Sequence, residues 1–221
     1  KYFKQITNIG MIKNELFLVE KIKGKYFCWM PAGDYLDKKF IRSGIDYLEQ
    51  NNDTVTCFGE TVIFQNYLEE IKKFKHTEIF NVDTKQRIKN FLNYQVADIL
   101  LYGIHRSSIK EKIRPIENCI NPEMLQIFSI IETGKYKGIK EMCFYKHYPD
   151  PQNPRNEDQK YILYRTTKNI KNRSRVYFQI VLKIFNHFNF LISIYLIKKL
   201  IIMRLFSKLK FIKLKPKPSE Y

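Results

Sequence analysis

The sequence is poor in the residues that mark disordered, disulfide-bonded or zinc-binding chains. Among 221 residues there are only 8 Gly, 8 Pro, 4 Cys and 4 His, against 44% hydrophobic content. This composition excludes a disordered chain and suffices for one sizeable core plus an appendage. The histidines are scattered and no cysteines form a C-x-x-C pair. We therefore expect free, buried thiols in a reducing compartment and no zinc site.

We expect no secretory leader, because the sequence does not open on a charged start, an apolar stretch and a small-residue cleavage site. The first residue is Lys1 rather than Met. We therefore expect a cytoplasmic protein whose natural N-terminus lies upstream of this residue.

Acidic residues are nearly absent from the C-terminal part of the chain. Residues 160–221 hold 15 of the 39 Lys and Arg but one of the 22 Asp and Glu, so their net charge is +14 of the total +17. Residues 1–159 carry the remaining +3. The basic character thus belongs to one segment, which needs an explanation separate from that of the globular part.

That segment combines its charge with many apolar residues. Residues 176–197 carry one full charge, Lys183, and are about long enough to cross a bilayer. Four polar residues interrupt this run, however, and basic residues follow it closely. We therefore interpret residues 174–213 as a basic amphipathic helical segment at an anionic membrane surface, and 214–221 as a tail.

Three alternatives for this segment remain. It could be a helical pair packed on the globular domain, a true membrane span or a nucleic-acid contact. Nucleic acid fits least, because the charges interleave with Ile, Leu and Phe instead of lying on a polar face with exposed aromatics.

Strand-like and helix-like runs alternate upstream of this segment. Strands are expected from β-branched and aromatic runs, and helices from apolar residues at helical spacing. The expected strands cover 2–6, 26–30, 54–59, 77–82, 99–106 and 138–147, and the expected helices 11–22, 38–50, 66–74, 84–96 and 121–133. The alternation predicts an α/β sandwich with a mainly parallel sheet. A proline-rich stretch then ends the compact domain near Pro149, so residues 150–173 are expected to form a linker.

Five segments of residues 1–148 occur in an order that resembles a known family. They are "NIGMIKN", "KIKGKYFCWMPAGDYLDKKFI", "VTCFG", "ILLYGIHRSSI" and "NPEMLQIFSIIETGKYKGIKEMCFYKH". Together they resemble the later part of a family 2 glycosyltransferase catalytic domain, of the inverting GT-A type. The resemblance implies a partial GT-A, Rossmann-like mixed sheet flanked by helices over residues 1–149. The family's two opening βα units, which hold the nucleotide base, would precede this sequence.

The resemblance also implies a chemistry. A sugar would pass, with inversion, from a nucleotide-sugar donor to a cell-surface glycan or a lipid-linked acceptor. Mg²⁺ or Mn²⁺ held by carboxylates would neutralise the diphosphate leaving group, and a carboxylate base would deprotonate the acceptor hydroxyl. The protein would then serve polysaccharide biosynthesis of the cell envelope as a peripheral protein at the inner face of the membrane.

Site residues follow from the same alignment of segments. Asp34 becomes the metal ligand and Glu123 the catalytic base, while the other two acidic positions of the metal turn fall on Pro31 and Gly33. Donor and diphosphate binding is assigned to Asn8, Gly10, Asn14, Arg106 and His147.

Simpler roles stand beside these assignments. Glu123 could be a first-turn acid stabilised by the helix dipole, Arg106 an exposed turn residue and His147 an ordinary loop histidine. The two missing acids also leave a second function open. In that alternative the chain is a catalytically degenerate or truncated glycosyltransferase-like protein that acts as a binding module.

Overall fold

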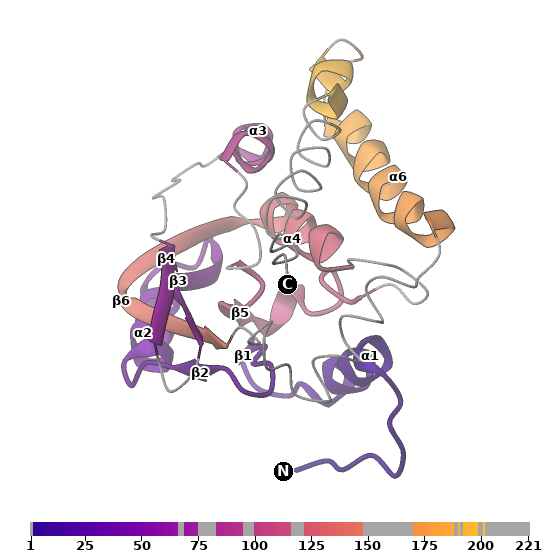
Figure 1. The fold of residues 1–221 in the computed structure, drawn as a ribbon. Coiled ribbons are helices and arrows are strands. Elements are labelled where there is room, and N and C mark those ends of the chain that lie inside the picture. Colours follow the sequence, from indigo (N-terminus) through magenta and orange to yellow (C-terminus); the bar gives the residue numbers. More distant parts are fainter. Residues whose placement is uncertain are drawn as a thin grey trace, which may run out of the picture.

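The computed structural model of the chain describes residues 2–65, 69–74, 83–94, 100–115, 122–147, 170–187, 190, 192–198 and 201. A mixed sheet lies at the centre, with helices against both of its faces (Figure 1). The expected strand at 77–82, most of the linker at 150–173 and the tail at 214–221 lie outside the described residues.

The helices are α1 (Met11–Lys21), α2 (Phe40–Gln50), α3 (Thr84–Tyr94), α4 (Pro122–Thr133) and α6 (Ile170–His187), with a 3-10 turn η2 (Ser107–Ile109). The strands are β1 (Tyr26–Cys28), β2 (Tyr35–Leu36), β3 (Thr54–Gln65), β4 (Glu69–Phe74), β5 (Ile104–Arg106) and β6 (Lys135–His147). The helix predicted at 121–133 is confirmed. It begins at proline, which suits a first helical position because that position needs no amide hydrogen.

The sheet has the strand order β1-β5-β3-β6-β2, and β4 pairs with β3 off this path. Among the described strands only β3 and β6 are parallel, and the other pairs are antiparallel. The mixed sheet is therefore confirmed, whereas the prediction of a mainly parallel sheet is wrong. Three residues, 66–68, separate β3 from β4, and a connection this short can join only antiparallel strands.

The two longest strands approach each other unusually closely at Gly59. Their register shifts between Phe58 and Glu60, and a Cβ atom on Gly59 would lie 2.1 Å from the Met142 carbonyl oxygen. Only glycine fits there, so this residue permits the bulge. Beyond the bulge β3 and β6 remain paired as far as Phe64 and His147.

Two apolar layers hold the helices on the sheet. Cys57 and Phe58 are neighbours on β3 whose side chains belong to opposite layers, as strand geometry requires. One layer packs Phe40 and Leu48 of α2 against the sheet. The other is larger and buries α4 together with residues of α3 and α6, among them Ile88.

Two predicted elements are wrong. Residues 2–6 form no strand, and Tyr2 and Ile6 are 88% and 102% exposed, so their apolar character is not used to bury them against a sheet. Residues 69–74, predicted as part of a helix, form β4 because their backbone pairs with the second half of β3. Pairing with an available strand here overrides the local helical spacing.

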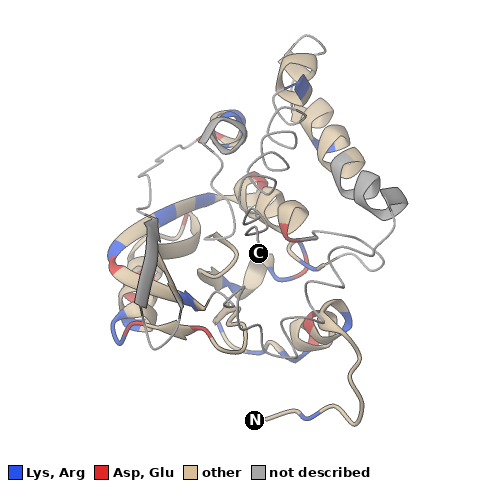
Figure 2. Cartoon of the chain, viewed as in Figure 1, with Lys and Arg blue, Asp and Glu red and all other residues tan. Residues whose placement is uncertain are grey.

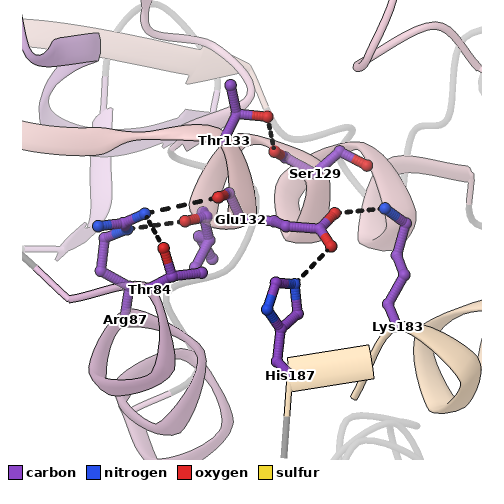
Figure 3. A network of polar contacts seen from close by, with 8 residues as sticks. Thr84, Arg87, Ser129, Glu132, Thr133, Lys183 and His187 are labelled. Atoms are coloured by element: carbon purple, nitrogen blue, oxygen red, sulfur yellow. Dashed lines mark hydrogen bonds and ion pairs between the residues drawn. The ribbon is translucent and has the colours of Figure 1, made fainter. Parts of the chain in front are cut away.

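The C-terminal end of α4 joins α3 and α6 through polar contacts (Figure 3). Arg87 of α3 donates from Nε to the Ile131 carbonyl oxygen at 2.8 Å. The Glu132 carboxylate contacts Lys183 Nζ and lies 2.7 Å from His187 Nε2. The one charge inside the apolar run of α6 is therefore paired with an acid of the domain. Within the described residues, none of the helices has the length and apolarity that a bilayer crossing requires.

Candidate functional site

The turn between β1 and β2 presents the predicted metal ligand. The Asp34 amide donates to the Pro31 carbonyl oxygen at 3.3 Å, and Gly33 between them has φ of +92°. A positive φ at the third residue is the signature of a type II turn, for which glycine is strongly favoured. The glycine that replaces an expected acid is therefore a requirement of the local backbone.

Asp34 is tied to the end of β6. Its Oδ1 accepts a hydrogen bond from the His147 amide at 2.8 Å. Burial raises the pKa of the Asp34 carboxyl, and the His147 amide and the positive charge of Lys146 oppose this rise only partly. Figure 2 shows Lys and Arg in blue along much of β6, so Asp34 lies beside a strand rich in positive charge.

Aromatic rings surround this pair of residues. Tyr35 stacks on Tyr145 with centroids 4.7 Å apart, and the Phe64 ring meets the His147 ring edge-on at 5.4 Å. The Tyr35 hydroxyl is buried without a hydrogen-bond partner. The ends of β2, β3 and β6 are thus fixed to one another around Asp34, which limits the positions that its carboxylate can take.

Glu123 lies in the first turn of α4, and a second acid, Glu15 of α1, contacts the same helix through Gln126. Gln126 is 2% exposed and donates from Nε2 to the Ile113 carbonyl oxygen at 2.9 Å and to Glu15 Oε2 at 3.4 Å. Its Oε1 is buried without a partner. Burial raises the pKa of Glu15 to about 7, the Gln126 hydrogen bond lowers it and the charge of Glu123 raises it further.

Sequence reasoning missed Glu15. It occupies an ordinary position in an amphipathic helix, and only the packing of α1 against α4 shows that it is half-buried and senses Glu123. A signal was present, since Glu15 directly follows the "NIGMIKN" segment. A carboxyl group whose pKa lies near neutrality is suited to accept or release a proton.

The structure gives Arg106 extensive internal contacts. Its guanidinium donates to the Thr54 carbonyl oxygen at 2.7 Å, to the Asn51 carbonyl oxygen at 3.1 Å and to the Leu48 carbonyl oxygen. The last two acceptors belong to the C-terminal end of α2, where a cation is stabilising. These contacts indicate a structural role for Arg106, and its assignment to the donor diphosphate stays a prediction.

Asn8, Gly10 and Asn14 surround the start of α1. Asn8 Oδ1 accepts a hydrogen bond from the Gly10 amide at 2.9 Å, and the Asn14 amide donates to the Gly10 carbonyl oxygen at 3.0 Å. The spacing of these residues therefore matches a helix start, and Asn14 shares α1 with Glu15. Their assignment to donor binding also stays a prediction.

The predicted site residues fall into four places. Asp34 and His147 are in direct contact, and Glu123 lies near Glu15 between α4 and α1. Arg106 lies at the end of α2, and Asn8, Gly10 and Asn14 lie around the start of α1. No group of three or more His, Cys, Asp or Glu that could hold a metal is found among the described residues. A single carboxylate still fits Mg²⁺, because this ion commonly uses one or two protein carboxylates together with substrate phosphates and water.

Comparison with solved structures shows what the fold is similar to. The structure of S. aureus TarS 1–349 in complex with UDP-GlcNAc matches with a TM-score of 0.59 at 12% identity, over 96% of this chain and 58% of that chain. A second crystal structure of S. aureus TarS 1–349 matches with a TM-score of 0.55 at 14% identity, over 97% of this chain and 57% of that chain. The chain thus spans less than two thirds of the length of these structures.

At these identities the likeness shows the fold alone. TarS is a glycosyltransferase of the GT-A type, so the described elements form part of a glycosyltransferase-like α/β fold. No protein-family profile matches the chain. No curated protein matches it either.

Proposed function

We propose that the chain is the later part of a glycosyltransferase that moves a sugar from a nucleotide-sugar donor to a cell-surface glycan or a lipid-linked acceptor, with inversion. The observation that carries the proposal is the contact between Asp34 and His147, because it brings the assigned metal ligand and a residue assigned to the donor diphosphate to one point of a GT-A-like sheet. The fold likeness to a protein bound to UDP-GlcNAc supports a nucleotide sugar as donor.

Asp34 would hold Mg²⁺ or Mn²⁺ together with the donor diphosphate. When bound, this ion neutralises the charge that develops on the leaving group. The protein's own part is to keep one Asp34 oxygen fixed on the His147 amide, which limits the orientations of the carboxylate. The positive charge of Lys146 beside it favours an anionic ligand.

Glu123 is the proposed base that takes the proton of the acceptor hydroxyl. Its place in the first turn of α4 favours its negative charge. Glu15 would adjust the proton affinity of this acid pair, because two nearby carboxylates do not ionise independently. Gln126 holds Glu15 against α4 and so keeps the pair together.

The proposal includes a place for the protein. It would act in polysaccharide biosynthesis at the inner face of the cell membrane, with the basic segment at 174–213 near a lipid-linked acceptor. A segment that combines many apolar residues with many basic ones is not expected to stay in water.

A degenerate binding module is the second candidate function. It is favoured by the turn itself, since Pro31 and Gly33 replace two acids and the type II geometry opposes any side chain at Gly33. Such a protein would bind a partner or a glycan without turnover.

Calorimetry with UDP and Mn²⁺ separates the two candidates, because metal-dependent binding supports the transferase and absence of binding supports the binding module. We expect binding that requires Mn²⁺ and is lost in Asp34→Asn, which removes charge but keeps an oxygen acceptor for the His147 amide. Asp46→Asn is the matched control, because Asp46 is exposed on α2 and only meets Arg42 at 3.9 Å. Binding that is equal with and without Mn²⁺, or unchanged in Asp34→Asn, would contradict the proposal.

A further inference from the structure

The outer face of α6 exposes large apolar side chains that are not buried by the part of the chain that the structure describes. Phe178, Leu182 and Phe185 are 60%, 46% and 38% exposed. Their spacing of four and three residues puts them on one stripe of the helix. A stripe of this kind marks a surface that is covered by a partner or a membrane.

A ring from beyond the end of α6 contacts the stripe. The Phe185 ring stacks on the Phe190 ring with centroids 6.3 Å apart. Further exposed apolar side chains follow in the same stretch: Ile194, Tyr195 and Ile201. We define these residues, together with Phe178, Leu182, Phe185 and Phe190, as the α6 ridge.

Contacts of the opposite face fix the direction of the ridge. Ile180 and Ile184 are fully buried in the larger apolar layer. Glu132 of α4 contacts Lys183 and His187 on the flank of the same helix (Figure 3). Burial raises the pKa of the Glu132 carboxyl, but the hydrogen bonds from Lys183 and His187 outweigh it and lower this pKa. A rotation of α6 that buried the ridge would break these contacts.

Positive charge accompanies the ridge. Lys198, which follows Ile194 and Tyr195, is exposed. Residues 160–221 carry 15 Lys and Arg. No acidic residue occurs from 160 to 219. A partner that fits this surface is therefore apolar in its interior and negatively charged at its boundary.

We propose that the α6 ridge inserts into the surface of an anionic lipid bilayer while Glu132 holds α6 on the domain. A nucleic acid matches the charge but offers no cover for four phenylalanine and leucine side chains, and a second copy of the chain would place equal positive charges face to face. Basic residues near an anionic leaflet and apolar side chains buried in it both strengthen such an association. This proposal makes an anionic bilayer the partner of the α6 ridge. It rests on the proposed function only for the identity of that bilayer, the inner face of the cell membrane.

Vesicle flotation of the 221-residue chain tests the proposal. We expect co-flotation with vesicles containing phosphatidylserine or phosphatidylglycerol, and at least a tenfold weaker association with pure phosphatidylcholine. The triple variant Phe178→Ser, Leu182→Ser, Phe185→Ser should lose most of the association at equal salt. Ile41→Ser is the matched control, because Ile41 is a 43%-exposed side chain on α2 and its loss should change nothing.

A second measurement keeps the result clear if the triple variant folds poorly. Single Trp substitutions at Phe178 and Phe185 should show blue-shifted fluorescence with anionic vesicles, whereas Trp at Ile41 should not. Association that is unchanged in the triple variant, or equal for both lipid compositions, would overturn the proposal. So would a dimer in light scattering that the triple variant converts to a monomer. Flotation needs no turnover, so its failure leaves sugar transfer untouched, and a lack of donor binding leaves flotation untouched.

Discussion

The backbone amide of His147 donates a 2.8 Å hydrogen bond to the carboxylate of Asp34, joining residues 113 positions apart. This contact links the tip of the turn after β1 with the end of the longest strand, β6. Asp34 therefore has a structural partner as well as a proposed ligand, and the two roles can be separated by substitution.

Asp34→Ala should lower the free energy of unfolding by about 1–3 kcal/mol, because the His147 amide loses a charged acceptor. Asp34→Asn should cost less than half as much, since the amide oxygen can still accept the bond. Both variants should lose binding of UDP with Mn²⁺. Urea unfolding monitored by circular dichroism measures the first effect. Equal losses of stability in the two variants would show that charge, and not the hydrogen bond, holds the turn.

Gly33→Asp restores an acid to the turn at a cost. A side chain at φ of +92° is strained, and Gly33→Ala carries the same strain without the carboxylate. We expect both variants to lose about 1 kcal/mol of stability. If the turn binds the metal with the donor diphosphate, Gly33→Asp should bind UDP with Mn²⁺ more tightly than Gly33→Ala does. Equal affinities in calorimetry would count against a metal at this turn.

Glu15 gives stability an unusual dependence on pH. Its pKa is raised to about 7 in the fold against an ordinary value of 4.5, so its contribution is complete below pH 4.5 and is lost as pH rises through 7. Glu15→Gln should abolish this loss, which is at most about 3 kcal/mol before discounting for partial exposure to water. Glu141→Gln, at an exposed position of β6, should leave the profile as it was. Denaturation at closely spaced pH values checks both variants.

His105 acts in the opposite direction. It is fully buried between Thr56 and Leu101, with Nε2 2.9 Å from the Leu101 carbonyl oxygen, and burial lowers its pKa to about 4. Its contribution is complete above pH 6.5 and is lost as pH falls through 4. The two residues therefore offset each other between about pH 4.5 and 6.5.

Single variants should expose each member of this balance. In Glu15→Gln, stability should fall on acidification from pH 6.5 to 4 by about 1.4 kcal/mol per pH unit at the steepest point. In His105→Gln, this acid loss should disappear and stability should fall only as pH rises. Parallel profiles for the two variants would contradict both assignments. The unfolding midpoint of each variant, measured at a series of pH values, provides the readout.

Glu132→Gln should loosen α6 without unfolding the domain. The variant leaves Lys183 without its acid partner, and breaking a partly buried ion pair typically costs several kcal/mol at most. Amide hydrogen exchange should accelerate in residues 178–187 while β3 and β6 keep their protection. Exchange that rises equally in the sheet would mean that α6 is an integral part of the domain core.

Elements with strong local signals could be predicted from the sequence. The helix at α4 has proline at its start and glycine after its end, and α1 has a clear apolar stripe, so neighbours were not needed to define them. β4 was missed because Glu69–Phe74 reads as helical spacing, and only its pairing with β3 makes it a strand. The strand predicted at 2–6 does not form, because an apolar run becomes a strand only when another strand pairs with it, and residues 2–6 have no such pairing among the described strands.

The candidate site could be predicted only in part. Asp34 and His147 were selected from two separate segments of one family resemblance, and their contact becomes visible only in the folded sheet. Glu15 was missed because its environment comes from α4, more than 100 residues away. Arg106 was selected as a ligand, yet its acceptors at the end of α2 become visible only in the folded chain.

Turnover of a nucleotide sugar tests the central claim most directly. Release of nucleoside diphosphate from UDP-GlcNAc and a panel of other nucleotide sugars should be measured with Mn²⁺, with and without a lipid-linked acceptor. The account predicts turnover by the wild-type protein that falls at least a hundredfold in Asp34→Asn and in Glu123→Gln, and is unchanged in Asp46→Asn. Absence of turnover with every donor, or equal turnover in Asp34→Asn, would contradict it.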